Sequence, residues 1–253
     1  MTETDDFERR FGGVHRLYGA AAFERFQQAH VCVVGVGGVG SWAAEALARS
    51  AVGRITLIDL DHVALSNVNR QIHALGDEFG KAKVSAMAER IRAINPRCVV
   101  TEIEDFVMPD NLDATLGRGY DFVIDAIDSA RVKAAMIAWC RRHKVNLIIS
   151  GGAGGRIDPG RMQLDDLTRT VQDPLLSRVR TLLRREYGFS RDPKKKFGVP
   201  CVFSTEALRR PQTACTPDEG ALTGLSCAGF GSSMSVTAGF GLMMAAEVLR
   251  RMS

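Results

Sequence analysis

The chain alternates between short apolar runs and segments in which apolar residues recur with helical spacing. Runs rich in β-branched residues predict buried strands at His30–Val36, Arg54–Asp59, Cys98–Ile103, Tyr120–Asp125 and Val145–Ser150. Helical spacing predicts helices at Gly38–Ser50, Lys81–Ile94 and Ser129–His143, with one or two short helices in residues 1–29. Strands that alternate with helices indicate an α/β fold with a doubly wound, mainly parallel sheet.

After Gly155 the alternation of strands and helices becomes less regular. We interpret this point as a change of role within one domain, not as the start of a separately folding domain. Residues 156–253 are then a C-terminal extension of the same domain. In it, Arg161–Leu167 is compatible with a strand, Pro174–Tyr187 with a basic helix and Ser190–Gly198 with a charged loop.

No charged residue occurs from Gly220 to Ala246, a length sufficient for a membrane span. Its glycines and serines indicate that the first part is a loop and that only about the last 20 residues are helical. We therefore favour a buried or subunit-interface helix, with a membrane contact as the alternative. The N-terminus is acidic, then basic, and has no apolar stretch typical of a signal peptide.

Composition adds few constraints. The content of 45% hydrophobic and 25% charged residues is ordinary for a soluble globular protein. A net charge of +4 permits a polyanionic partner but does not require one. The six cysteines form no C-x-x-C pair, so the usual zinc-knuckle spacing is absent, and we expect a reduced, cytoplasmic protein.

A glycine-rich motif follows the first predicted strand. Its G-x-G-x-x-G pattern consists of Gly35, Gly37, Gly38 and Gly40. The glycines allow a tight turn, and the helix N-terminus that follows favours a phosphate. Asp59, about 20 residues on, is placed to accept from a ribose hydroxyl. The predicted fold is therefore Rossmann-like, but this motif alone does not choose between NAD, FAD and ATP.

Cations beyond the second strand favour ATP. Arg70 and Lys83 follow the glycine motif, and a triphosphate uses such a pair, whereas a dinucleotide has no need of it here. The alternative is a solvated charged loop. The string D-L-D-H-V-A-L-S-N-V-N-R-Q, with G-K-A-K after it, resembles the ubiquitin-activating-enzyme-like (ThiF/MoeB/HesA-type) adenylating superfamily, which uses ATP to activate a carboxylate.

The resemblance implies a set of site residues. It assigns ribose binding to Asp59, ATP binding to Asn67, Arg70 and Gln71, and a phosphate contact to Lys83. It places Asp128 near Mg²⁺ and the phosphates, so that Arg70, Lys83 and Asp128 form the catalytic set. Ser129 stands where the superfamily usually has Asn. The alternative interpretation of Asp128 is a helix N-cap with Ser129 in the first turn, and the two roles can coexist.

The superfamily also implies a homodimer in which an N-terminal arginine reaches the partner's phosphates. Arg16 and Arg10 are both candidates, and spacing does not choose between them; we include Arg16 in the ATP site. The resemblance thus implies one adenylating domain over residues 1–253, with a nucleotide-binding core at about 28–155 and a substrate or dimer portion at about 156–253.

Cysteine usage bears on the branch of the superfamily. Sulfur-carrier activators usually have paired C-x-x-C ligands, which this chain lacks, and ubiquitin-type activators need a thioester cysteine. Cys201, Cys215 and Cys227 lie in the appropriate half, but a structural thiol is the better interpretation of each. Activation of a ubiquitin-like or sulfur-carrier protein, with a sulfur-transfer or carrier partner, remains the alternative function.

Longer strings resemble the bacterial tRNA threonylcarbamoyladenosine dehydratases. They include R-F-G-G-V-H-R-L-Y-G, G-V-G-G-V-G-S-W-A-A-E-A-L-A-R-S, N-R-Q-I-H-A-L, V-I-D-A-I-D-S, G-G-A-G-G-R-I-D-P and C-V-F-S-T-E. This family implies ATP-dependent cyclisation of a threonylcarbamoyl group on tRNA, with ATP and Mg²⁺ as cofactors. A tRNA substrate agrees with a basic cluster formed by Arg178, Arg180, Arg184, Arg185, Arg191, Lys194, Lys195 and Lys196, whose alternative is a solvated helix face and loop.

Overall fold

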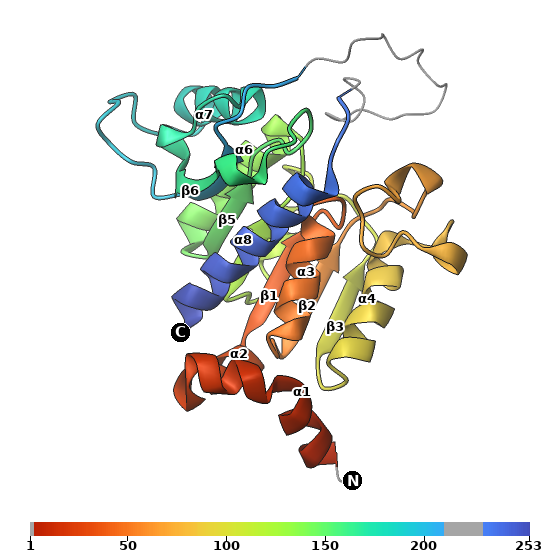
Figure 1. Cartoon of the computed structure of the whole chain (residues 1–253). Helices are drawn as coiled ribbons and strands as arrows, with labels where there is room; N and C mark the ends of the chain where they lie inside the picture. Colours follow the sequence, from red (N-terminus) through yellow and green to blue (C-terminus); the bar gives the residue numbers. More distant parts are fainter. Residues whose placement is uncertain (1–2, 210–229) are drawn as a thin grey trace.

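The structure is a computed structural model and describes residues 3–209 and 230–253 (Figure 1). In this part of the chain seven strands form one sheet. They are β1 (His30–Val34), β2 (Arg54–Ile58), β3 (Val99–Ile103), β4 (Phe122–Asp125), β5 (Asn146–Ser150), β6 (Met162–Asp166) and β7 (Pro200–Ser204). The helices are α1 (Glu3–Tyr18), α2 (Ala20–Gln28), α3 (Gly40–Arg49), α4 (Lys83–Ile94), α5 (Leu112–Leu116), α6 (Ala130–His143), α7 (Pro174–Glu186) and α8 (Met234–Met252).

The strand order is β3-β2-β1-β4-β5-β7-β6, and every neighbouring pair is parallel except β6 with β7. The predicted α/β class, Rossmann-like with a mainly parallel sheet and a C-terminal extension, is confirmed. Strand β7 was not predicted. It adds to β5 in parallel, so that the extension continues the sheet of the first half.

Helices cover both faces of the sheet (Figure 1). One face packs against α3, α4 and α8, and the other against α6 and α7. Each face carries its own apolar cluster, which explains why β1, β4 and β5 are almost continuously apolar rather than alternating. The carboxyl ends of the parallel strands lie at one edge, where the connections to α3 and α6 begin.

The C-terminal helix α8 packs on α3 rather than standing apart. The two helices approach so closely that a Cβ on Gly241 would lie 2.3 Å from the Val39 carbonyl oxygen. The predicted limits of this helix were wrong, because α8 starts at Met234 and continues past Ala246 to Met252. Its charged end is tied together by Glu247, which pairs with Arg250 and Arg251.

Membrane contact was the alternative for Gly220–Ala246. Across residues 3–209 and 230–253, no helix combines the length and apolarity needed to cross a bilayer. Residues 220–229 lie outside the described part of the chain.

Candidate functional site

The glycine motif forms a tight turn between β1 and α3. Gly35 has a φ of +84°, which L side chains rarely adopt, and its amide donates to the Ile58 carbonyl on β2. A Cβ on Gly40 would lie 1.8 Å from the Gly35 carbonyl oxygen, so only glycine fits. The turn therefore brings the N-terminus of α3 to the carboxyl edge of the sheet, where its amides favour a phosphate.

Two predicted ATP-site residues lie against this turn. A Cβ on Gly38 would be 3.1 Å from the Arg70 side chain, and one on Gly37 would be 3.9 Å from Gln71 Nε2. Trp42 of α3 donates its indole N–H to the Arg70 carbonyl at 2.9 Å, which fixes the Arg70 segment on the helix. The Arg70 guanidinium donates to the Ser66 carbonyl and to Asn69 Oδ1. The structure thus joins residues 28 or more positions apart.

Asp59 follows β2 and is tied to the glycine turn. Its Oδ2 accepts from the Val36 amide at 2.6 Å, and its Oδ1 accepts from the Asp61 amide at 2.9 Å. Burial raises the pKa of this carboxyl, and the charge of Lys83 and these two amides oppose the shift. Asp59 therefore positions the turn, whatever ligand it also contacts.

Lys83 and Asn67 lie in the same region. Lys83 opens α4 with a largely buried side chain, and its ammonium is 2.7 Å from Asp61 Oδ2. Asn67 is buried, and its Oδ1 accepts from the Ala64 amide, which closes the short turn that leads to Arg70. Each side chain is thus held by a partner in this region, at the sheet edge that carries the glycine turn.

Asp128 lies in the connection from β4 to α6. A Cβ on Gly35 would meet Ile127 and Ala126, so this connection lies directly beside the glycine turn. The alternative of Asp128 as a helix cap is wrong, because Ser129 occupies the N-cap position of α6 and Asp128 precedes it as an exposed side chain.

A buried ion pair under this connection was not predicted. Asp125 and Lys133 are both 0% exposed, and Lys133 Nζ lies 2.7 Å from Asp125 Oδ1 and 3.2 Å from the Asp125 carbonyl oxygen. Burial raises the pKa of Asp125, against the opposing charge of Lys133. The pair fixes the end of β4 to α6. In the sequence, the signal for this ion pair was a lysine eight residues after the aspartate that ends a predicted strand.

A second buried pair, Arg156 with Asp173, was also missed. Asp173 caps α7 by accepting from the Leu176 amide, and its other oxygen accepts from the Gly152 amide. Arg156 is 1% exposed and donates to the Gln172 carbonyl. Together they attach α7 to the segment after β5.

The two N-terminal arginine candidates differ in their surroundings. Arg10 donates to the carbonyls of Ala93 and Ile94, the last residues of α4, and pairs with Asp6. Arg10 is thus held by its own chain. Arg16 is exposed in the last turn of α1.

Of the three cysteine candidates, Cys201 lies in the described part of the chain. Cys201 is fully buried in β7, and burial raises the pKa of its thiol well above the ordinary value. A buried, protonated thiol is a poor nucleophile, which supports the structural interpretation. Cys215 and Cys227 lie outside the described residues.

The basic cluster of the C-terminal extension is not uniformly exposed. Arg180 turns inward and donates to the Thr170 carbonyl and hydroxyl, and Arg184 lies over the Phe197 ring. Arg185 pairs with Glu186. The members that stay exposed and form no ion pair within the described residues are Arg178, Arg191, Lys194, Lys195 and Lys196.

A glycine turn that opens a helix, flanked by the partly buried Arg70 and the buried Lys83 at the carboxyl edge of a mainly parallel sheet, defines a Rossmann-like nucleotide-binding protein. Comparison with known proteins narrows the class. The chain belongs to the ThiF family, whose model matches residues 12–253.

Relatives resemble the chain over nearly its whole length. It is 53% identical to the tRNA threonylcarbamoyladenosine dehydratase of Escherichia coli, over 98% of this chain and 95% of that one. It is 48% identical to the enzyme of that name from Haemophilus influenzae, over 100% and 96%. A crystal structure of the E. coli enzyme in complex with ATP matches it with a TM-score of 0.90 at 52% identity, covering 100% of this chain and 97% of that one.

Proposed function

We propose that this chain catalyses the ATP-dependent dehydration of the threonylcarbamoyl group of N6-threonylcarbamoyladenosine in tRNA by activating its carboxylate. The observation that carries the proposal is the likeness to the dehydratases over nearly the whole chain. The E. coli relative has been crystallised with ATP and with AMP, which agrees with nucleotide chemistry at the glycine turn.

The geometry supports the following roles. The turn from Gly35 to Gly40 and the N-terminus of α3 receive the phosphates, and Arg70 and Lys83 offset their charge. Asp59 accepts from ribose with lone pairs that its two amide partners do not use. Asn67 and Gln71 complete the ATP site; the buried Gln71 Oε1 has no hydrogen-bond partner within the described residues.

Asp128 is the proposed Mg²⁺ ligand. Mg²⁺ is usually bound by one or two carboxylates together with substrate phosphates and water. The donor set fits, since Asp128 is exposed beside the glycine turn, whereas Asp125 is committed to Lys133. The described residues contain no group of three or more His, Cys, Asp or Glu side chains that could hold a metal alone. Bound there, the ion would offset negative charge on the phosphates.

The proposed chemistry has two steps. A carboxylate oxygen of the threonyl group attacks a phosphorus atom of ATP, and a P–O bond of ATP breaks to release ADP (leaving an acyl phosphate) or pyrophosphate (leaving an acyl adenylate). The carbamoyl nitrogen then attacks the activated carboxyl carbon, loses its proton and expels the phosphate or AMP. This closes a five-membered ring, and the tethered nucleophile makes the step effectively unimolecular. No enzyme nucleophile is needed, which agrees with the burial of Cys201.

The assembly we propose is a homodimer in which Arg16 contacts the partner's ATP phosphates, since Arg10 is held by α4. Residues 28–155 form the nucleotide-binding core of one adenylating domain, and residues 156–253 serve the substrate or the dimer. A tRNA substrate implies a cytoplasmic enzyme.

Nucleoside mass spectrometry tests the proposal. tRNA that carries threonylcarbamoyladenosine is incubated with the protein, ATP and Mg²⁺. We expect the modified nucleoside to lose one water, with no loss when ATP is omitted and strongly reduced loss with Asp128→Ala. An unchanged nucleoside mass with the wild-type protein refutes the proposal.

The alternative is adenylation of the C-terminus of a ubiquitin-like or sulfur-carrier protein, favoured only by the superfamily. In that case ATP consumption would depend on added carrier protein, and a combined Cys201→Ser, Cys215→Ser and Cys227→Ser variant would lose thioester formation. The dehydratase should keep its activity in that variant.

A further inference from the structure

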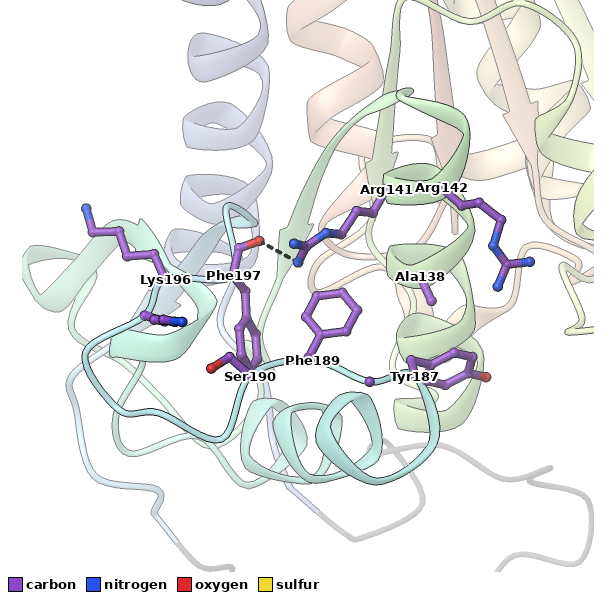
Figure 2. A pocket seen from close by; sticks show the side chains of 10 residues that line it. Ala138, Arg141, Arg142, Tyr187, Phe189, Ser190, Lys196 and Phe197 are labelled. Carbon is purple, nitrogen blue, oxygen red and sulfur yellow. Dashed lines mark hydrogen bonds between the residues drawn. The ribbon is translucent and has the colours of Figure 1, made fainter.

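A cavity of about 510 Å³ lies between the end of α6 and the loop from α7 to β7. Figure 2 shows Arg141 and Arg142 on the helix, with Tyr187, Phe189, Phe197 and Lys196 on the facing segment. This volume falls within the roughly 300–1,000 Å³ typical of small-ligand sites. None of the predicted ATP-site residues lines it.

The floor of the cavity is aromatic and fixed. The rings of Phe189 and Phe197 are buried and meet edge-on with centroids 5.0 Å apart. Arg141 stacks 4.7 Å from the Phe189 centroid and donates to the Phe197 carbonyl (Figure 2). Arg141 thus braces the wall, whereas Tyr187, half-buried at the edge, offers a ring to a ligand.

The rim is positively charged without neutralising partners. Within the described residues, none of the lining cations Arg141, Arg142, Lys195 and Lys196 forms an ion pair with a carboxylate. The two nearest acids along the loop are engaged elsewhere: Glu186 pairs with Arg185, and Asp192 accepts from the Lys194 amide. Unpaired cations around an aromatic floor suit a phosphate attached to a stacking base.

The cavity is separated from the glycine turn by the length of α6. Ile127, just before this helix, contacts the turn, and Arg141 and Arg142 lie in its last turn. Fourteen residues of helix span about 20 Å. An RNA stem–loop can bridge such a distance, and a small nucleotide bound as co-substrate at the turn cannot.

We propose that this cavity binds one nucleotide of the tRNA substrate, with its base against Tyr187 and with backbone phosphates of the bound strand at Arg142 on one side and at Lys195 on the other. The choice of tRNA as the ligand rests on the proposed function, whereas the prediction that these residues contribute to RNA affinity rests on the cavity itself. The basic cluster predicted from the sequence included Lys195 and Lys196 of this site. It did not include Arg141 and Arg142, because these two cations come from α6.

Fluorescence anisotropy with labelled tRNA, repeated over a range of salt concentrations, tests the site. Arg142→Gln and Lys195→Gln should each lower the slope of log affinity against log salt by about 1, and the double variant by about 2. Tyr187→Ala should weaken binding about tenfold, whereas Tyr187→Phe, which keeps the ring, should not. Arg54 of β2 is exposed and forms no ion pair within the described residues, so Arg54→Gln is the matched control and should leave the slope unchanged.

Turnover separates the cavity from the ATP site. The double variant should raise KM for tRNA while kcat and the affinity for ATP stay at wild-type values, and Arg142→Lys with Lys195→Arg should restore tRNA affinity. Unchanged tRNA affinity and salt slope in the double variant would overturn the inference and favour an acidic protein partner. If the wild-type protein binds tRNA through these residues but removes no water, the proposed reaction is refuted and the assignment of the cavity as a tRNA-binding site stands.

Discussion

His73 carries a pH dependence that follows from its surroundings. Its side chain is 2% exposed, and neither ring nitrogen has a hydrogen-bond partner within the described residues. Burial, together with the charges of Lys83 and Arg90, lowers the pKa of the imidazole from 6.5 to about 4. The folded protein therefore keeps His73 neutral at pH values where the unfolded chain binds a proton.

The sign of the effect is definite. As the pH falls below 6.5, the unfolded chain is stabilised by a proton that the folded chain cannot take up until about pH 4, so the free energy of unfolding decreases. With these two pKa values, the loss attributable to His73 is about 2 kcal/mol between pH 7 and pH 5. His73→Leu should remove this part of the pH dependence, because leucine does not titrate.

Urea unfolding of both proteins at pH 7, 6 and 5 measures the effect. A change in packing shifts the His73→Leu stability equally at every pH, and the other titrating groups contribute to both proteins, so the difference between the two curves isolates His73. The variant should gain about 2 kcal/mol relative to wild type on acidification from pH 7 to pH 5. Parallel curves would refute the assignment of a buried, neutral imidazole.

Three further substitutions test the core and the site. Gly40→Ala should lower the free energy of unfolding by about 1–3 kcal/mol, because the added Cβ meets the Gly35 carbonyl, and calorimetry should detect no ATP binding. Gly13→Ala on α1 is the control, because a Cβ added there meets open space. Lys133→Met should cost about 3–5 kcal/mol in urea unfolding by leaving Asp125 buried and unpaired, and Asp125→Asn added to it should recover part of the loss. Arg70→Ala should lower kcat/KM for ATP roughly 100-fold with tRNA affinity unchanged; a loss of tRNA affinity instead would contradict its role at the phosphates.

Local patterns predicted the first half of the fold because the central strands of its sheet are covered on both faces. Buried parallel strands such as β1 and β4 are short apolar runs, and the helices between them keep a 3.6-residue period, so each element is visible without its neighbours. In the extension, β7 is an apolar run of similar length that directly follows a charged loop. Nothing local distinguishes it from a buried loop segment, and its pairing with β5 defines it as a strand.

The candidate site shows the same division. The sequence alone determined the glycine turn, since its spacing after a strand requires a tight connection to a helix, and it identified Arg70 and Lys83 as cations near that turn. Only the tertiary structure decided that Arg70 lies against Gly38, that Arg10 is held by α4 while Arg16 is exposed, and that Asp125 pairs with Lys133. It also brought Arg142 of α6 to the loop that carries Lys195. Spacing along a chain records which face of an element is buried, whereas contacts between elements depend on how those faces pack, and packing is set by the whole fold.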